Sequence, residues 1–238
     1  MDWFVRLVKS SIGKKALMGL SGAALLGFVI VHMAGNLLVF AGPEALNEYA
    51  KGLHDLGPVL WAMRLGLLGA VLTHIAVAFA LFSENQQARP VKYQHPATIK
   101  ASPQSRTMIV SGFLLLLFIV YHLLQLTFGV IDGDTHAANP AALYDLKGEM
   151  VPNVYHMVVS AFTQPLVTIL YIVSMLLLGA HLSHGIASMF QSLGLSNPRY
   201  RPLIKKLGWG LSALLVTGNI AMPLCVLLGI IGGAPAGA

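Results

Sequence analysis

Cysteine is nearly absent from this chain, in which Cys225 is the single one among 238 residues. One thiol cannot form an internal disulfide, ligate an iron–sulfur cluster or complete the C-x-x-C-H motif that attaches a c-type haem. Charged residues are also scarce, at 10% of the chain, whereas soluble domains average about 25%. Because 56% of the residues are hydrophobic, we expect an integral membrane protein.

Five apolar stretches predict the fold class. Arg64 is the single Lys, Arg, Asp or Glu inside them, and they cover about residues 16–40, 59–82, 107–130, 163–190 and 208–231. Each is long enough for a helix to cross a bilayer, which takes about 20 residues. The first stretch is too long for the core of a signal peptide, so we expect it to be retained. The sequence therefore predicts an all-α membrane protein with five transmembrane helices, forming one integral membrane domain over residues 1–238.

Basic residues alternate along the segments that flank these stretches. Four, one, four, one and four Lys or Arg occur in residues 1–15, 41–58, 83–106, 131–162 and 191–207, respectively. By the positive-inside rule this alternation predicts a cytoplasmic N-terminus, an outer C-terminus and a multi-pass protein of the cell inner (cytoplasmic) membrane. The net charge of +6 is thereby explained as a topology signal, with membrane lipid as a partner and no role in binding nucleic acid.

Histidine recurs inside the apolar stretches. Of nine histidines, five lie within the first four stretches: His32, His74, His122, His181 and His184. With a rise of about 1.5 Å per residue, His32 and His122 both lie roughly 6 Å from the midpoint toward the outside. His74 and His184 lie toward the cytoplasmic side, because their helices run inward. Height therefore groups His32 with His122 and His74 with His184, although spacing alone does not choose between His181 and His184.

Two imidazoles from two helices at one height suit the axial ligation of a haem iron. The missing C-x-x-C-H motif makes both haems b-type, and two axial imidazoles leave no open position on iron, so we expect electron transfer. The first four helices are predicted to form a bundle around two stacked b haems. Interhelical hydrogen bonds or a proton relay are the alternatives for each histidine taken singly. Zinc is disfavoured because no carboxylate or thiol lies at these depths.

Three further polar residues lie at the outer ends of the stretches. Arg64 enters the second stretch from outside and either reaches back to the interface or pairs with a propionate of the outer haem. Asn36 follows His32 by one turn, and Gln125 follows His122 by three residues. Both indicate a polar pocket beside the outer pair, where a quinone would bind, with helix-packing polarity as the alternative for each.

Several motifs together resemble one known family. SSIGKKALMGLSG and VHMAGNLLVF open the chain, followed by GPEALNEYAKGL, LTHIAVAFAL and YHLLQL. MVVSAFTQP, HLSHGIASMFQSLGL, PRYRPLIKKLG and GNIAMPL complete the order. Over essentially the whole chain, these motifs resemble the succinate dehydrogenase cytochrome b558 family, the di-haem membrane anchors of succinate:quinone oxidoreductases and fumarate reductases.

The resemblance implies an outer haem b on His32 and His122 and an inner haem b on His74 and His184, the latter because the family ligand is followed by glycine. It also implies two partners on the cytoplasmic face, a flavoprotein subunit with covalent FAD and an iron–sulfur subunit. Family members generally react with menaquinone near the outer haem. The acidic quinone-site residue of some relatives is not matched here, and His54 falls near its place.

The expected function is that of a cytochrome b subunit of the respiratory chain and tricarboxylic acid cycle. It would pass electrons from succinate, through FAD and iron–sulfur clusters, to a quinone, or run in reverse as a fumarate reductase. The first alternative is a di-haem b subunit of a hydrogenase or formate dehydrogenase. The second is a membrane transporter with a histidine relay.

Overall fold

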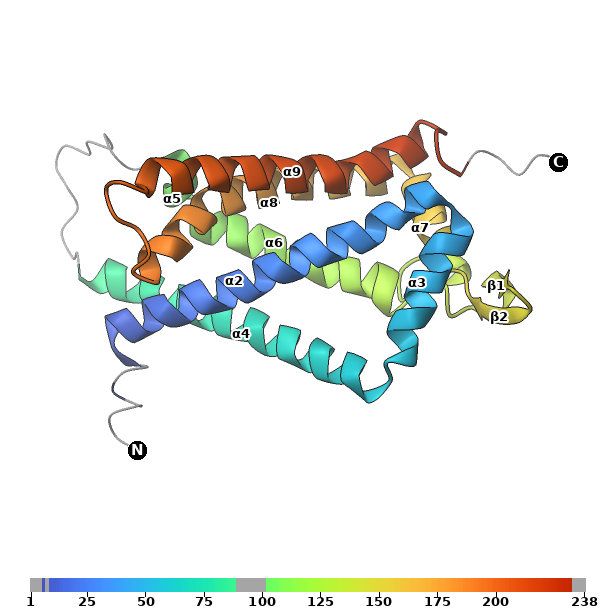
Figure 1. Ribbon diagram of the computed structural model, residues 1–238, viewed down its shortest axis with the longest axis horizontal. Helices are drawn as coiled ribbons and strands as arrows, with labels where there is room; N and C mark the ends of the chain where they lie inside the picture. Colours follow the sequence, from blue (N-terminus) through green and yellow to red (C-terminus); the bar gives the residue numbers. More distant parts are fainter. Residues whose placement is uncertain (1–5, 7–8, 89–101, 233–238) are drawn as a thin grey trace. The chain divides into compact units, whose positions relative to one another are not determined.

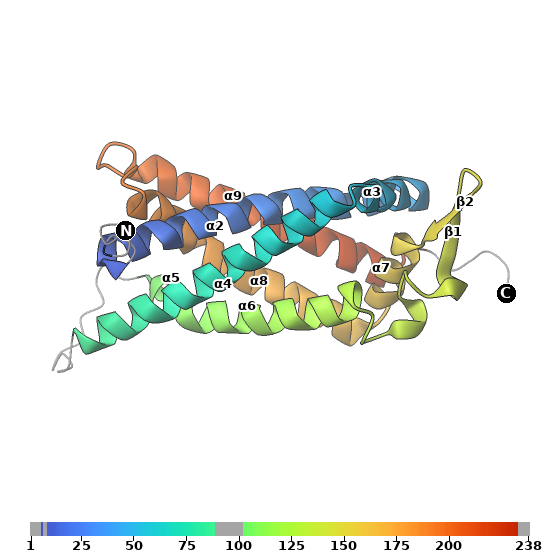
Figure 2. The same ribbon diagram turned by 90° about the horizontal axis from the view of Figure 1, so that it is seen from below.

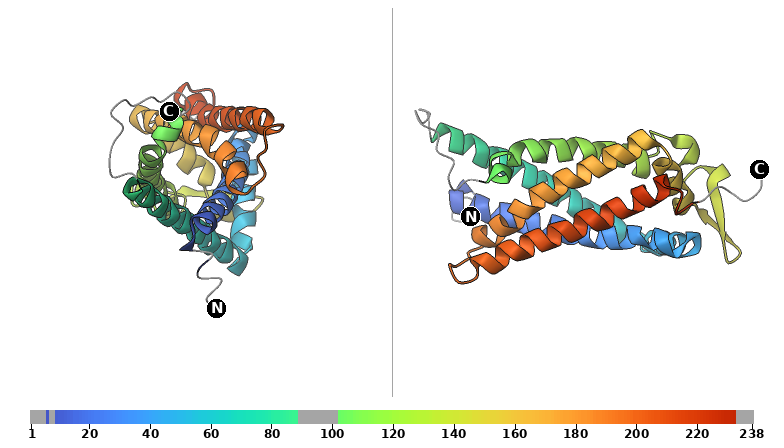
Figure 3. Two further views of the ribbon diagram at one scale, coloured as in Figure 1. Left: turned by 90° about the vertical axis from the view of Figure 1, so that its left-hand side faces the viewer. Right: turned by 90° about the horizontal axis from the view of Figure 1, so that it is seen from above.

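The computed structural model describes residues 6, 9–88 and 102–232. Five helices in it are long and apolar enough to cross a membrane, and their course can be followed in Figures 1 and 3. They comprise α2 (Ser11–Asn36) with its continuation to Ala41, α4 (Pro58–Gln87), α6 (Met108–His122) with its continuation to Thr127, α8 (Pro165–Ser192) and α9 (Arg201–Leu227). The expectation of a multi-pass helical membrane protein is confirmed. The described residues do not include His95. They also do not include Arg89, Lys92 and Lys100, which contributed to the count of basic residues.

Helix ends follow local chain chemistry rather than hydropathy. Helix α9 begins at Arg201, seven residues before the apolar stretch, and α2 begins at Ser11, five residues before its stretch. Basic side chains are good helix formers, so the helical conformation extends beyond the apolar stretch. Pro58 and Pro165 each occupy the first position of a helix, where the missing N–H costs no hydrogen bond.

Short helical segments extend two of the long helices. A 3-10 helix, η1 (Leu37–Ala41), follows α2, and a π-helix, η2 (Leu123–Thr127), follows α6. Gly42, with φ of +98°, separates η1 from α3 (Pro43–Asp55). A glycine is suited there because side-chain-bearing residues rarely adopt a positive φ.

The chain divides into two compact units, each containing parts of the long helices. The first comprises Met1–Val29, Met63–Phe113 and Gly179–Ala213. The second comprises Ile30–Ala62, Leu114–Leu178 and Leu214–Ala238. Each unit is described by itself below.

The second unit has a hydrophobic core built around α7 (Val154–Phe162). Phe162 is fully buried, and the cluster around it also includes Val39, Leu46, Ala137, Met157, Val158, Val159, Val167, Tyr171, Met222 and Val226. Asn153 caps α7 by accepting a hydrogen bond from the His156 N–H at 3.0 Å. The buried Asn47 of α3 donates to the Asn153 side chain at 3.2 Å and accepts from the Tyr155 N–H at 3.1 Å. These bonds join α3 to α7.

A small β-hairpin in the second unit departs from the all-α expectation. Strands β1 (Leu143–Leu146) and β2 (Glu149–Pro152) pair antiparallel beside α3 (Figure 2). Lys147 and Gly148 form the tight turn, with φ of +56° and +91°, as two-residue hairpin turns require. The apolar-stretch pattern gave no reason to expect strands, because the pairing depends on this turn.

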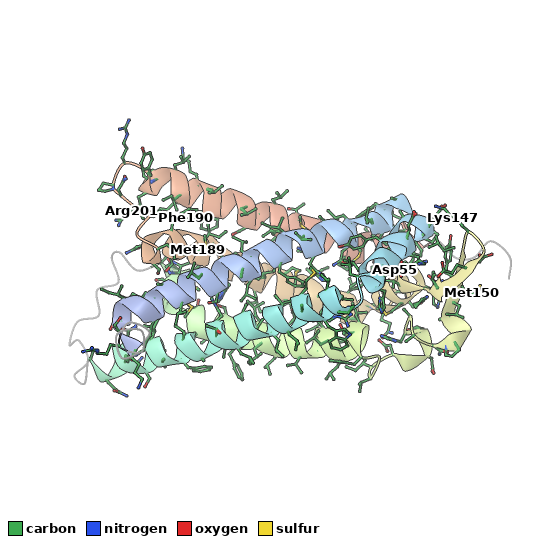
Figure 4. All side chains as sticks on the ribbon, turned by 60° about the horizontal axis from the view of Figure 1, so that its bottom comes forward. Asp55, Lys147, Met150, Met189, Phe190 and Arg201 are labelled. Atoms are coloured by element: carbon green, nitrogen blue, oxygen red, sulfur yellow. The ribbon has the colours of Figure 1, made fainter. Side chains whose placement is uncertain are left out.

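Exposed ion pairs connect the hairpin to α3. Lys147 lies 3.2 Å from Glu44 and 3.4 Å from Glu48, and Lys51 lies 2.7 Å from Asp55 and 3.5 Å from Glu149. Figure 4 labels Asp55 and Lys147. The hydrogen bonds to Glu44 and then Glu48 raise the pKa of Lys147, and the one to Asp55 raises the pKa of Lys51.

In the first unit, glycines let helices approach closely. A Cβ on Gly19 of α2 would lie 3.1 Å from the Leu193 side chain, and one on Gly208 of α9 would lie 3.5 Å from that of Ile186. Lys14, near the start of α2, forms an ion pair with Glu84, near the end of α4.

Candidate functional site

The second unit brings together the two histidines that height grouped as the outer pair. His32 lies in α2 and His122 is the last residue of α6, and both side chains are half-buried. Their ring centres are 5.8 Å apart, with the ring planes at 88°. Two imidazoles that share one metal atom have ring centres about 6 Å apart, because each metal–nitrogen bond is about 2.0–2.1 Å long. The observed separation is compatible with a metal between the two rings, and it is also that of an ordinary edge-to-face ring pair.

A hydrogen-bond chain runs from His122 to an aspartate. His122 Nδ1 lies 3.2 Å from the Tyr171 hydroxyl, which donates to Gln125 Oε1 at 3.0 Å. Gln125 Nε2 in turn donates to Asp132 Oδ2 at 2.8 Å. Because the one hydroxyl proton of Tyr171 is used toward Gln125, the Tyr171 oxygen accepts from His122 Nδ1–H. The lone pair of His122 is then on Nε2, where it is available to a metal.

Local folding places the members of this chain. The π-helix after His122 buries Gln125 to 2% exposure, and such wide turns are frequent at functional sites. Asp132 adopts the left-handed conformation, with φ of +57°, where the chain reverses. Tyr171 of α8 is held between Phe118 and Phe162, with ring centres 5.0 and 4.8 Å away.

Sequence reasoning did not single out Tyr171 and Asp132. Tyr171 lies in an apolar stretch, and Asp132 lies in the connecting segment 131–162. A signal was nevertheless available, because a buried tyrosine hydroxyl nearly always requires a hydrogen-bond partner. Gln125 was identified as a pocket residue, and the structure places it at the centre of the chain.

The first unit contains His74, His181 and His184, and two of them repeat the arrangement of His122. His74 Nδ1 lies 3.2 Å from Ser21 Oγ, whose proton goes to the Leu17 carbonyl at 2.7 Å. His181 Nδ1 lies 3.0 Å from Ser111 Oγ, whose proton goes to the Met108 carbonyl at 3.1 Å.

When the serine proton is on the carbonyl, the serine oxygen accepts from Nδ1–H of the imidazole, and the lone pair of His74 and of His181 is then on Nε2. Glycines lie against both rings. A Cβ on Gly22 would be 3.4 Å from the His74 ring, and one on Gly112 would be 3.6 Å from the His181 ring. Each ring thus contacts a serine hydroxyl and the glycine that follows that serine in the same helix.

The surroundings of His181 and His184 differ. His181 carries the Ser111 hydrogen bond, whereas His184 lines a polar pocket. A Cβ on Gly185, the residue after His184, would meet nothing within 4 Å. The space beside this glycine is therefore open. The expectation that His184 is the ligand partner of His74 stays a prediction, and the hydrogen bond favours His181.

The remaining predicted residues are distributed over both units. Asn36, the half-buried last residue of α2, and His54, exposed near the end of α3, belong to the second unit with Gln125. Arg64 is exposed on α4 and belongs to the first unit. The pairing of Arg64 with a propionate of the outer haem therefore stays a prediction. A quinone site at Asn36, Gln125 and His54 also stays a prediction.

Among the described residues, no three His, Cys, Asp or Glu side chains form a cluster that could hold a metal ion. The candidate sites consist instead of imidazoles from separate helices, a donor set that suits axial ligation of a macrocycle-bound iron. Comparison with protein-family models, with curated proteins and with solved structures finds no match.

Proposed function

We propose that the chain is the membrane-anchor cytochrome b subunit of a succinate:quinone oxidoreductase and carries two haem b groups. The observation that carries this proposal is the His32–His122 pair, with rings 5.8 Å apart and His122 Nδ1 bound to Tyr171. A metal-binding histidine almost always donates its other ring N–H to an acceptor, which fixes its tautomer.

The residues present fit two b haems. His32 and His122 would hold the outer one, and His74 would hold the inner one with a histidine of α8. The resemblance assigns that second ligand to His184, and the Ser111 hydrogen bond favours His181. When bound, each group would supply one-electron transfer. The hydrogen-bond partners at Nδ1 hold the rings of His74, His122 and His181 and would set how strongly each ring donates electrons through Nε2.

The quinone site belongs to the same proposal. Gln125 and Asn36 lie in the unit that contains the outer pair, and Asp132 is connected to Gln125 by a hydrogen bond. The amide N–H groups of Gln125 and Asn36 would donate to the carbonyls of a quinone, with menaquinone the type that the family resemblance favours. Asp132, together with the exposed His54, is the acid–base group available for quinone protons.

Partners and orientation also follow from the proposal. A flavoprotein subunit with FAD and an iron–sulfur subunit would dock at the cytoplasmic face, in a cell inner membrane with the N-terminus inside. An outer quinone site would require electrons to cross the membrane, at about 2.3 kcal/mol per charge per 100 mV. The potential would thus influence whether succinate oxidation or fumarate reduction is favoured.

A reduced-minus-oxidised spectrum of the purified protein tests the haem proposal. We expect a b-type α-band with two redox components, of which His32→Ala and His74→Ala each remove one. A histidine-relay transporter predicts no such band, and a spectrum without it would refute the haem assignment. Co-purification separates the remaining choices, because a hydrogenase or formate dehydrogenase anchor would bring different peripheral subunits.

A further inference from the structure

Asp132 is the acidic end of the hydrogen-bond chain that begins at His122. Its side chain is half-buried, whereas Gln125 and Tyr171, which connect it to His122, are 2% and 7% exposed. The carboxylate forms no ion pair with any of the described residues. Water therefore has access to this uncompensated carboxylate but not to the two groups that connect it to the imidazole.

The backbone on both sides of Asp132 holds its carboxylate against the π-helix. The N–H groups of Val130 and Ile131 both donate to the Leu124 carbonyl, at 2.9 and 3.3 Å, so the chain folds back on η2 directly before Asp132. The Asp132 carbonyl then accepts from the N–H and from the hydroxyl of Thr135, at 3.1 Å each. Its φ of +57° is a conformation that aspartate tolerates better than most residues with a side chain. These four bonds position Asp132 independently of the chain to His122.

The charge on Asp132 determines the direction of the bonds in the chain. An ionised carboxylate only accepts, so the Gln125 amide presents Nε2 to it and leaves Oε1 for the Tyr171 hydroxyl. The Tyr171 oxygen is then the acceptor for His122 Nδ1–H. Because hydrogen bonds in a chain polarise one another, the negative end strengthens the bond at the imidazole. Protonation of Asp132 removes this charge and weakens that bond.

Other titratable side chains near Asp132 come from four elements. Helix α7 packs against η3 (Gly133–Thr135), which begins directly after Asp132, and the rings of Tyr121 and Tyr171 lie 6.2 Å apart. Besides His122, the titratable groups on α6, on α8, in and directly after η3, and on α7 are Tyr121, Tyr171, Asp134, His136, Tyr155 and His156. Titration of Asp132 must therefore be distinguished above all from that of Asp134 and His136, which lie in the same loop.

We propose that Asp132 is a positioning residue for His122 and that protonation of its carboxylate from the outer side raises the midpoint potential of the outer haem. The proposal rests on the proposed function and adds a regulation of the same site. An imidazole that donates its Nδ1–H more strongly stabilises oxidised iron, so ionised Asp132 lowers the potential. By linkage, an electron that arrives at the outer pair increases the affinity of Asp132 for a proton, which it takes from water. The carboxyl O–H is the one covalent bond formed, and no bond in the protein is broken.

Redox titration of the b-haem absorbance in the purified haem-loaded protein tests this proposal when repeated from about pH 8 to about pH 4, a range that spans carboxylate titration. In the unmodified protein we expect the potential of the outer component, identified with His32→Ala, to rise as the pH falls. Asp132→Asn keeps the size of the side chain and removes its charge. At pH 8 it should change the oxidised-to-reduced ratio of the outer component roughly threefold to tenfold, or about 30–60 mV toward higher potential, and remove the pH dependence.

A double variant tests whether the effect passes through the chain. Tyr171→Phe breaks the chain, so adding Asp132→Asn to it should change the same ratio less than about twofold, or about 20 mV. An equal shift in both backgrounds would overturn the positioning role, because the charge would then act through space.

Asp134→Asn and His136→Gln are the matched controls, since both residues lie in the same loop and Asp134 is exposed. Both variants should retain the pH dependence of the outer component. The proposal is overturned if either control reproduces the effect of Asp132→Asn, or if the outer component of the unmodified protein does not depend on pH. A preparation without a b-type band would refute the proposed function itself, whereas two b-type components whose potentials do not respond to Asp132→Asn would refute this proposal alone.

Discussion

Replacing Tyr171 by phenylalanine removes the one oxygen that links His122 to Gln125. The ring is 7% exposed and packed against Phe118 and Phe162, and phenylalanine fills the same space. The change is therefore a loss of two hydrogen bonds without a cavity. His122 Nδ1–H loses its acceptor, and Gln125 Oε1 loses its donor.

The size of the effect follows from the lost bond. An imidazole that donates its Nδ1–H is a better electron donor through Nε2 and stabilises oxidised iron. Loss of a net hydrogen-bond contribution of about 0.5–1.5 kcal/mol should raise the midpoint potential of the outer haem by about 20–60 mV, since 59 mV corresponds to a factor of ten for one electron. The proposed inner haem should not change, because the Tyr171 hydroxyl bonds to His122 and Gln125, which belong to the outer site.

A redox titration of the b-haem absorbance in the purified protein resolves the two components, and the His32→Ala protein identifies which one is outer. Tyr121→Phe is the matched control, because its ring lies 6.2 Å from that of Tyr171 and its hydroxyl is not part of the chain. The reasoning is wrong if Tyr171→Phe leaves the outer component unchanged within about 10 mV. It is also wrong if both variants shift both components alike.

Two other substitutions have clear expected outcomes. His181→Ala should remove the inner b-type component from the spectrum while His184→Ala retains it, because His181 carries the Nδ1 hydrogen bond; the opposite result would support the assignment from family resemblance. Gly35→Ala should lower the free energy of unfolding by about 1–3 kcal/mol, since its Cβ would lie 2.6 Å from the Tyr49 ring. Gly27→Ala, whose Cβ would meet nothing within 4 Å, should not lower it in the same chemical-denaturation assay.

The helices were predictable from the sequence because a membrane-spanning segment must be long, apolar and internally hydrogen-bonded. The ends of the helices were less predictable. The first turns of α9 are basic and those of α2 include two lysines, so a hydropathy criterion begins both helices several residues late. The β-hairpin was missed because it depends on two residues with positive φ, Lys147 and Gly148, within a polar connecting segment.

The outer histidine pair was predictable for a different reason. Helix rise is nearly constant, so position along a span converts directly into height, and His32 and His122 were expected at one level. Rotation about the helix axis is not fixed in this way. Whether His181 or His184 faces His74 depends on how α8 packs, and the Tyr171–Gln125–Asp132 chain depends on a π-helix and a left-handed aspartate. None of these follows from composition or spacing.

The hydrogen bonds of His74, His122 and His181 also bear on the choice between a metal ligand and a proton relay. In each case Nδ1 faces a hydroxyl whose own proton is used elsewhere, by the Leu17 carbonyl, Gln125 and the Met108 carbonyl, respectively. With its proton used in this way the hydroxyl accepts from the imidazole, and this arrangement favours the tautomer with hydrogen on Nδ1. A relay requires the two ring nitrogens to exchange their roles, whereas a metal ligand requires one of them to remain deprotonated. The same hydrogen-bond arrangement at Nδ1 of three histidines therefore favours metal ligation through Nε2.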